Sequence, residues 1–158
     1  MVYILIIAVV AVSDLLIKNY IERYYWNNKD KYIFGKFINI KKYRNEGGFL
    51  NIFEKKSRFV KYASLTVLGI VLCIFVLLFN KKRMKLLKTG LALVIGGAFS
   101  NEYDRIVNGG VTDYFSFSVK GLDKVVFNMG DMAIFAGLVL IMKGYNGLRK
   151  QEEDIISL

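Results

Sequence analysis

The chain has 158 residues, 54% of them hydrophobic, with a mean hydropathy of +0.37, which is more apolar surface than the interior of a soluble protein this small can cover. Its net charge of +10 favours anionic lipid headgroups over nucleic acid as partners, because the aromatic residues lie in apolar runs and not among the basic ones. The absence of histidine and the single Cys73 exclude Ser-His-Asp triads, Cys-His dyads, HExxH zinc sites and an internal disulfide, so neither a metal nor a cofactor is expected.

Four apolar segments predict an α-helical integral membrane protein with four spans, at residues 2–18, 59–80, 88–106 and 125–143. The second segment and, nearly, the fourth are long enough by themselves, whereas the first and third must include polar residues. Polar residues in a span normally face the bundle interior or a wet cavity. The first segment has no basic residues before it and no small-residue cleavage site after it, so it is expected to be retained.

Residues 19–58, between the first two spans, predict a small β-rich extracytoplasmic element. Apolar and polar residues alternate through 32–34 and 37–41, as in short strands, and Gly35 and Gly47-Gly48 are turn or bulge signals. The aromatic cluster Tyr24-Tyr25-Trp26 is typical of a membrane interface. Residues 107–124 are expected to form a second extracytoplasmic loop.

Charge near the spans gives a divided prediction of topology. The basic loop at residues 81–87 indicates that this loop, the tail at 144–158 and both termini are cytoplasmic. Eleven Lys and Arg residues between 19 and 61 would then lie outside, against the rule.

Several polar residues fall near the outer ends of the predicted spans. One interpretation is a structural network that pairs Asp14 with Lys18, and Asp104 with Arg105. Asp113 and Asp131 have no cation at an obvious spacing, and two such carboxylates can share one proton and activate water. Spacing alone leaves both interpretations open, because the proximity of the two acids is assumed.

Five short motifs follow in chain order: DLLIK at 14–18, RNEGGF at 44–49, GGAFSNEYDR at 96–105, VTDY at 111–114 and FNMGD at 127–131. Together with the four apolar segments, they resemble the lipoprotein signal peptidase family, also called signal peptidase II. The resemblance implies an aspartyl endopeptidase of the bacterial cytoplasmic membrane, with its active site toward the extracytoplasmic face and both termini cytoplasmic. The implied substrates are diacylglyceryl-modified prolipoproteins, cleaved before the lipidated Cys, and the family is inhibited by globomycin.

The resemblance also assigns roles by position. Asp113 and Asp131 match the catalytic pair, and Asp14 and Lys18 match a supporting pair near the site. The residues that match the substrate site are Asn45, Gly47, Asn101, Arg105 and Asn128. Phe49 is expected to contact the lipidated residue.

The chain departs from the family pattern at Gly48, Ser100, Glu102, Thr112, Tyr114 and Gly130, and it lacks a proline common before the last motif. Glu102 adds a carboxylate where the family has an apolar residue, and Gly130 is expected to loosen the backbone beside Asp131. These changes leave a weak or repurposed paralogue as one alternative. A small transporter or assembly factor is a second alternative, because an intramembrane Asp also suits an ion pathway. A transport carboxylate is expected near the bilayer midplane, whereas Asp113 falls in a predicted loop.

Overall fold

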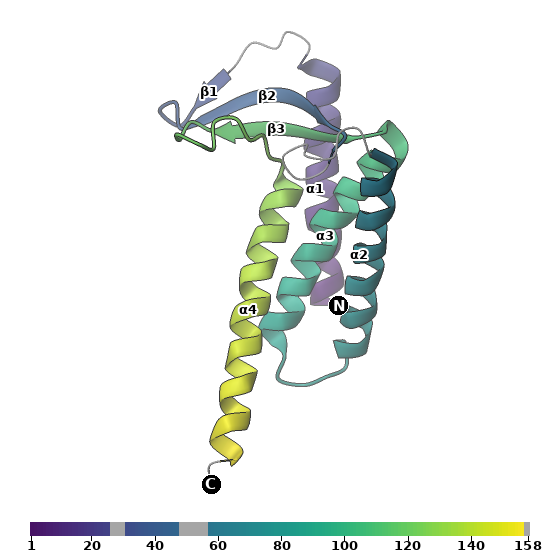
Figure 1. Ribbon diagram of the computed structural model, residues 1–158, viewed down its shortest axis with the longest axis vertical. Helices are drawn as coiled ribbons and strands as arrows, with labels where there is room; N and C mark the ends of the chain where they lie inside the picture. Colours follow the sequence, from purple (N-terminus) through teal and green to yellow (C-terminus); the bar gives the residue numbers. More distant parts are fainter. Residues whose placement is uncertain (26–30, 48–56, 157–158) are drawn as a thin grey trace.

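The computed structural model describes residues 1–25, 31–47 and 57–156, so Trp26, Gly48 and Phe49 lie outside the described residues. A small sheet lies across one end of a group of helices, and both chain ends lie away from that sheet (Figure 1). The elements in chain order are α1 Val2–Tyr24, β1 Lys31–Ile33, β2 Ile38–Asn45, α2 Ser57–Leu78, α3 Lys85–Asn108, β3 Val111–Phe117 and α4 Met129–Ile156.

The sheet is antiparallel with the order β1-β2-β3. The two strands predicted from alternation are confirmed, and Gly35 between them has a φ of +63°, which a glycine adopts without strain. The third strand was not predicted. Asp113 therefore lies on strand β3 and not in a loop, because the β-branched and aromatic residues of 111–117 pair with β2.

Helix α3 is the centre of the helical part, since it contacts α1, α2 and α4. This position explains its low hydropathy: its charged and amide side chains Lys88, Asn101, Glu102 and Asp104 are buried against protein. Among the described helices only Val2–Tyr24 and Arg58–Leu78 are long and apolar enough to cross a membrane by length and composition.

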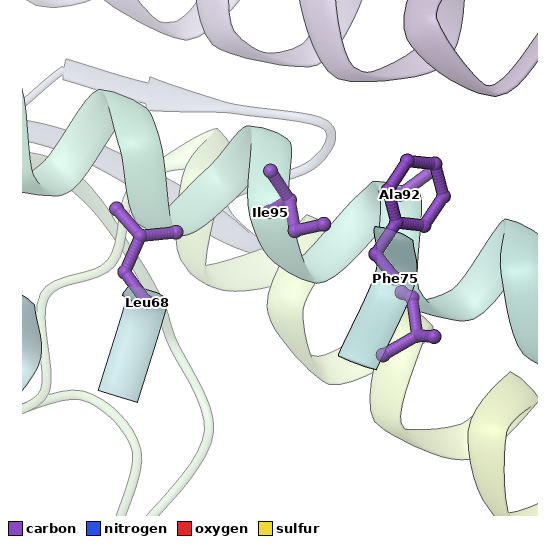
Figure 2. Packing of buried hydrophobic residues seen from close by; sticks show 5 residues of the cluster. Leu68, Phe75, Ala92 and Ile95 are labelled. Carbon is purple, nitrogen blue, oxygen red and sulfur yellow. The ribbon is translucent and has the colours of Figure 1, made fainter. Parts of the chain in front are cut away.

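Helices α1 and α2 carry apolar side chains on both their inner and outer faces. On the inner face, Leu68 and Phe75 of α2 pack with Ala92 and Ile95 of α3 (Figure 2). The outer faces expose large apolar residues, which include Leu5, Val9 and Leu16 on α1, and Ile70, Val76 and Leu77 on α2. Apolar surface on this scale is expected to face lipid and not water.

Glycines allow α3 and α4 to approach closely along their length. Gly90 and Gly97 of α3 lie seven residues apart, and so do Gly130, Gly137 and Gly144 of α4. A Cβ on Gly90 would lie 2.6 Å from the carbonyl oxygen of Gly137, and one on Gly97 would collide with that of Gly130. Small residues at such a seam let two helix backbones pack directly, as in membrane helix pairs.

Enlarging one glycine of this seam should destabilise the protein. A Cβ on Gly137 would lie 2.6 Å from the Gly90 oxygen and 2.7 Å from Cγ2 of Val94. We expect Gly137→Ala to lower the free energy of unfolding by about 1–3 kcal/mol, measured as an earlier thermal transition by circular dichroism in detergent. Gly147→Ala on the same helix is the matched control, because no atom lies within 4 Å of its added Cβ.

Helix α4 begins at Met129 and continues to Ile156, so it extends beyond the apolar segment at 125–143. Phe127, which precedes the helix, instead pairs with Phe115 of β3. This displacement places Asn128 just before the first turn of α4 and Asp131 within that turn.

Candidate active site

Asp113 and Asp131 line one cavity of about 350 Å³, together with three further residues that the sequence assigned to the site, Asn45, Asn101 and Arg105. These side chains come from β2, α3, β3 and α4. Asn128 hydrogen-bonds to both acids from behind the cavity wall. Gly47 is buried just after β2 but does not contribute to the lining.

The chain between β3 and α4 folds back so that the two acids meet. Phe127 exchanges backbone hydrogen bonds with Phe115 of β3, at 2.7 and 3.0 Å, in an isolated bridge. The rings of Phe115, Phe117 and Phe127 pack together beside this bridge. Because Phe127 is held against β3, the next residue, Asn128, lies beside Asp113.

Asn128 and Asp131 form a reciprocal cap at the start of α4. The Asp131 N–H donates to Oδ1 of Asn128 at 2.8 Å, and the Asn128 N–H donates to Oδ2 of Asp131 at 3.1 Å. This is the arrangement of a capping box, which satisfies two N–H groups left free at a helix start. The Asn128 side chain also donates from Nδ2 to Oδ1 of Asp113 at 2.6 Å. One fully buried residue therefore contacts both carboxylates and sets their relative position.

Asp113 is almost completely buried, with 1% of its surface exposed. Burial raises the pKa of its carboxyl group to about 7, and the negative charge of Asp131 acts in the same direction. Hydrogen bonds from Nδ2 of Asn45, at 2.9 Å, and from Asn128 oppose this rise only in part. Near neutral pH this carboxyl group can therefore hold a proton.

Asp131 is connected to the buried Asp14–Lys18 pair through one amide. Nδ2 of Asn101 donates to Oδ1 of Asp131 at 2.9 Å, and Oδ1 of Asn101 accepts from Nζ of Lys18 at 2.6 Å. The Lys18 ammonium lies 2.8 Å from the Asp14 carboxylate, which confirms the predicted pair. The ammonium thus fixes which end of the Asn101 amide faces Asp131.

Two residues beside the site were noted in the sequence only as departures from the family pattern. The Ser100 hydroxyl donates to Oδ2 of Asp14 at 2.6 Å, and the Tyr114 hydroxyl donates to Oδ1 of the same group at 2.9 Å. Tyr114 also accepts from the N–H of Met129 at 2.9 Å. The Tyr114 hydroxyl therefore ties Asp14 to β3 and α4, which carry the two acids, and the Ser100 hydroxyl ties it to α3. The signals in the sequence were the departures from the family pattern at these two positions and the Asp14–Lys18 pair.

The predicted pairing of Asp104 with Arg105 is wrong. Asp104 points toward β3, where Oδ2 accepts the Thr112 N–H at 2.6 Å, and Oδ1 accepts from Asn108 at 2.6 Å. Nη1 of Arg105 lies instead 3.8 Å from Oε2 of Glu102. Residues 104 and 105 are adjacent on a helix and point about 100° apart, so they seldom face one another.

The structure gives Gly130 a different role from the expected loosening of the backbone beside Asp131. A Cβ at this position would lie 2.9 Å from Oδ2 of Asp14 and 3.0 Å from Oδ1 of Asn128. The glycine therefore permits close packing of Asp14 and Asn128 around the start of α4, where the sequence suggested loosening.

Among the described residues, no three Asp, Glu or Cys side chains gather as metal ligands do.

Two solved structures described as a bacterial membrane enzyme share this fold. The first has a TM-score of 0.79 at 25% identity, and the match covers 97% of this chain and 90% of the chain in that structure. The second has a TM-score of 0.76 at 25% identity, with coverages of 91% and 92%. The apolar helices, the buried acids and these likenesses define a membrane enzyme.

The family model of signal peptidase II matches residues 6–145, and the chain belongs to this family. Similar relatives named lipoprotein signal peptidase occur in Actinobacillus succinogenes, 32% identical over 93% of this chain and 92% of the relative, and in Staphylococcus haemolyticus, 31% identical over 89% and 90%. The match with a relative from Methylocella silvestris, 32% identical, spans 67% of this chain and 62% of that protein.

Proposed function

We propose that this protein removes signal peptides from prolipoproteins that carry a diacylglyceryl-modified Cys, and that it cleaves the bond before that Cys. The observation that carries the proposal is the joint placement of Asp113 and Asp131 on one cavity, with Asn128 hydrogen-bonded to both. The name lipoprotein signal peptidase, which the relatives carry, supports this choice of substrate class.

The two acids divide the work of an aspartic peptidase. Asp131 is the ionised member and takes a proton from a water molecule, whose oxygen attacks the scissile carbonyl carbon. Asp113, with its raised pKa, holds the shared proton and gives it first to the carbonyl oxygen. As the tetrahedral intermediate collapses, the C–N bond breaks and the amine of the lipidated Cys leaves with a proton from the pair. No covalent enzyme intermediate is formed.

The cavity walls suit a lipidated peptide. Polar groups of Asn45, Asn101 and Arg105 can hold the main chain near the acids, while α2 and α4 supply apolar lining, which includes Val67, Leu68, Val71, Ile134 and Phe135. We expect the acyl chains to remain in the lipid beside these helices. The peptide would then enter as an extended segment.

The same proposal places the chain in the bacterial cytoplasmic membrane. All four helices would cross it, with α3 and α4 tolerating polar residues because these are turned toward the bundle interior or the cavity. The sheet would rest on the extracytoplasmic surface. Both termini lie at the end away from the sheet, consistent with a cytoplasmic location beside the basic loop at 81–87 (Figure 1).

The direct test is a gel-shift assay with purified protein and a synthetic diacylated precursor in detergent or liposomes. We expect one faster product, formed only from the lipidated precursor and blocked by globomycin. Cleavage of the unlipidated precursor at an equal rate would contradict the assigned substrate class. Absence of cleavage by folded, membrane-inserted protein would favour the weak or repurposed paralogue.

The pH dependence of cleavage should reflect Asp113. Because burial and Asp131 raise its pKa to about 7, the proton that it donates is present below that pH and is lost above it. We expect kcat/KM to fall about tenfold per pH unit above about pH 7. The measurement is a pH–rate profile with circular dichroism at each pH, and a constant rate up to pH 9 would remove Asp113 as the proton donor.

A further inference from the structure

Three buried side-chain atoms of residues that line the cavity have no hydrogen-bond partner within the protein. They are Oδ1 of Asn45, Oε1 of Glu102 and Nε of Arg105, and all three residues line the cavity that holds the two acids. Within residues 1–25, 31–47 and 57–156 only one other buried side-chain atom, Oδ1 of Asn39, shares this condition. An unsatisfied buried polar atom destabilises the free protein, so three around one cavity indicate a ligand that pairs with them.

Glu102 is the residue of the three for which family resemblance supplies no role. It is 3% exposed on α3, directly after Asn101, which holds Asp131. Its Oε2 accepts a hydrogen bond from the Ser64 hydroxyl at 2.6 Å and lies 3.8 Å from Nη1 of Arg105. One carboxylate oxygen is therefore used within the protein, and Oε1 is left for another donor.

A purely structural role explains only half of this side chain. Balancing the charge of Arg105 and accepting from Ser64 both involve Oε2. The second oxygen remains buried without compensation, which is unfavourable unless a donor arrives. The Nε of Arg105, three residues further along α3, lacks an acceptor in the same way.

Glu102 and Arg105, three residues apart on α3 and in contact with one another, offer one acceptor and one donor, which is what one residue of an extended peptide requires. In an extended chain the N–H and C=O of the same residue point to the same side, and edge recognition of peptides uses such pairs. We propose that Glu102 is a substrate-binding residue, whose Oε1 accepts a main-chain N–H of the precursor while Nε of Arg105 donates to the C=O of that residue. This inference rests on the proposed function and adds a contact that an apolar residue at position 102 cannot make.

The test removes the two partners of the proposed hydrogen bond one at a time. Diacylated precursors are synthesised with an ester oxygen in place of one amide N–H, at each of the three peptide bonds ahead of the scissile bond. The unmodified and ester precursors are assayed with the wild-type protein, Glu102→Leu and Glu102→Gln. Glu102→Met serves if the Leu variant does not fold. Glu153→Leu is the matched control, because it removes an exposed carboxylate near the far end of α4.

At one of the three positions, replacing the amide by an ester should lower kcat/KM in the wild type by roughly tenfold or more beyond the loss that the same replacement causes in Glu102→Leu. The reason is that only the wild type loses a hydrogen bond to a charged group. Glu102→Gln retains an acceptor and should show part of the same sensitivity, and Glu153→Leu should match the wild type. Equal losses in the wild type and Glu102→Leu at all three positions would overturn the contact. If the wild-type protein fails to cleave the unmodified precursor, it is the proposed function that fails.

Discussion

Replacing Asp113 by Asn should leave a folded protein that no longer processes a diacylated precursor. The substitution removes the group that holds the shared proton but keeps its size, and loss of one acid–base group lowers rates by roughly 10²–10⁴-fold. The product band in the gel-shift assay should disappear at enzyme concentrations where the wild type reaches completion. Processing at a rate within tenfold of the wild type would exclude Asp113 from the catalytic pair.

The structure explains why Asp113→Asn should fold. The Asn45 amide now donates to Asp113 at 2.9 Å, while its own oxygen has no partner. Turning that amide over would place its oxygen toward the new NH₂ group. Asp131→Asn should abolish processing equally but fold less well, because its oxygens face two donors, from Asn101 and Asn128. The Asn101 amide cannot turn, since its oxygen accepts from Lys18.

The stability of the Asp113→Asn variant gives an independent check through its pH dependence. The folded protein raises the pKa of Asp113 from 3.8 to about 7, so between these values the folded state binds more protons than the unfolded state. The contribution of this group to stability is therefore fully present below about pH 3.8 and is lost as the pH rises through about 7. The Asn variant should lack this loss. The difference in unfolding temperature, variant minus wild type, should therefore be larger at pH 8 than at pH 5.

Lys18→Ala should reduce the free energy of unfolding by about 3–5 kcal/mol, because removal of one partner leaves a buried charge unpaired. Lys18 is 2% exposed and Asp14 is fully buried, with 2.8 Å between ammonium and carboxylate. We expect a lower folded yield and an earlier thermal transition in detergent. The hydroxyl groups of Ser100 and Tyr114, which also bind Asp14, should keep the loss toward the lower end of that range.

A double variant separates the charge effect from general disruption. Asp14→Leu combined with Lys18→Met removes both charges and keeps apolar volume, so it should recover much of the stability lost in Lys18→Ala. Its turnover should remain low, since Asn101 would lose the ammonium that orients it toward Asp131. Normal folded yield of Lys18→Ala with lost turnover would instead assign Lys18 a direct role in the reaction.

Composition and periodicity were sufficient to predict the helices and two of the strands. Apolar runs indicate lipid-facing helices whatever lies between them, and the alternation at 32–34 and 37–41 is visible without partners. Strand β3 was not predicted because its side chains are buried on both faces, so apolar and polar residues do not alternate by exposure. Helix α4 begins after the start of the apolar run at 125–143, because Phe127 within that run pairs with Phe115 of β3.

The candidate site residues could be named from short motifs, but the contacts between them could not be predicted from those motifs. Asn128 and Asp131, three apart at the start of a helix, have the spacing of a capping box, which is a local signal for their contact. The spacing of Glu102 and Arg105, three apart on one helix, is compatible with an ion pair, but no local pattern could show that Glu102 accepts from Ser64, which lies on another helix.

The sequence by itself determined the membrane character of this protein and its family, and it supplied Asp113 and Asp131 as the candidate acids, since apolar content and short motifs are local properties of the chain. Only the tertiary structure decided that these acids share a cavity. The bridge of Phe127 to β3 and the cap of Asn128 on α4 bring together groups eighteen residues apart, with Asp113 on a strand and Asp131 on a helix. Such proximity depends on long-range backbone pairing and on burial, and neither can be predicted from residues that are neighbours in the sequence.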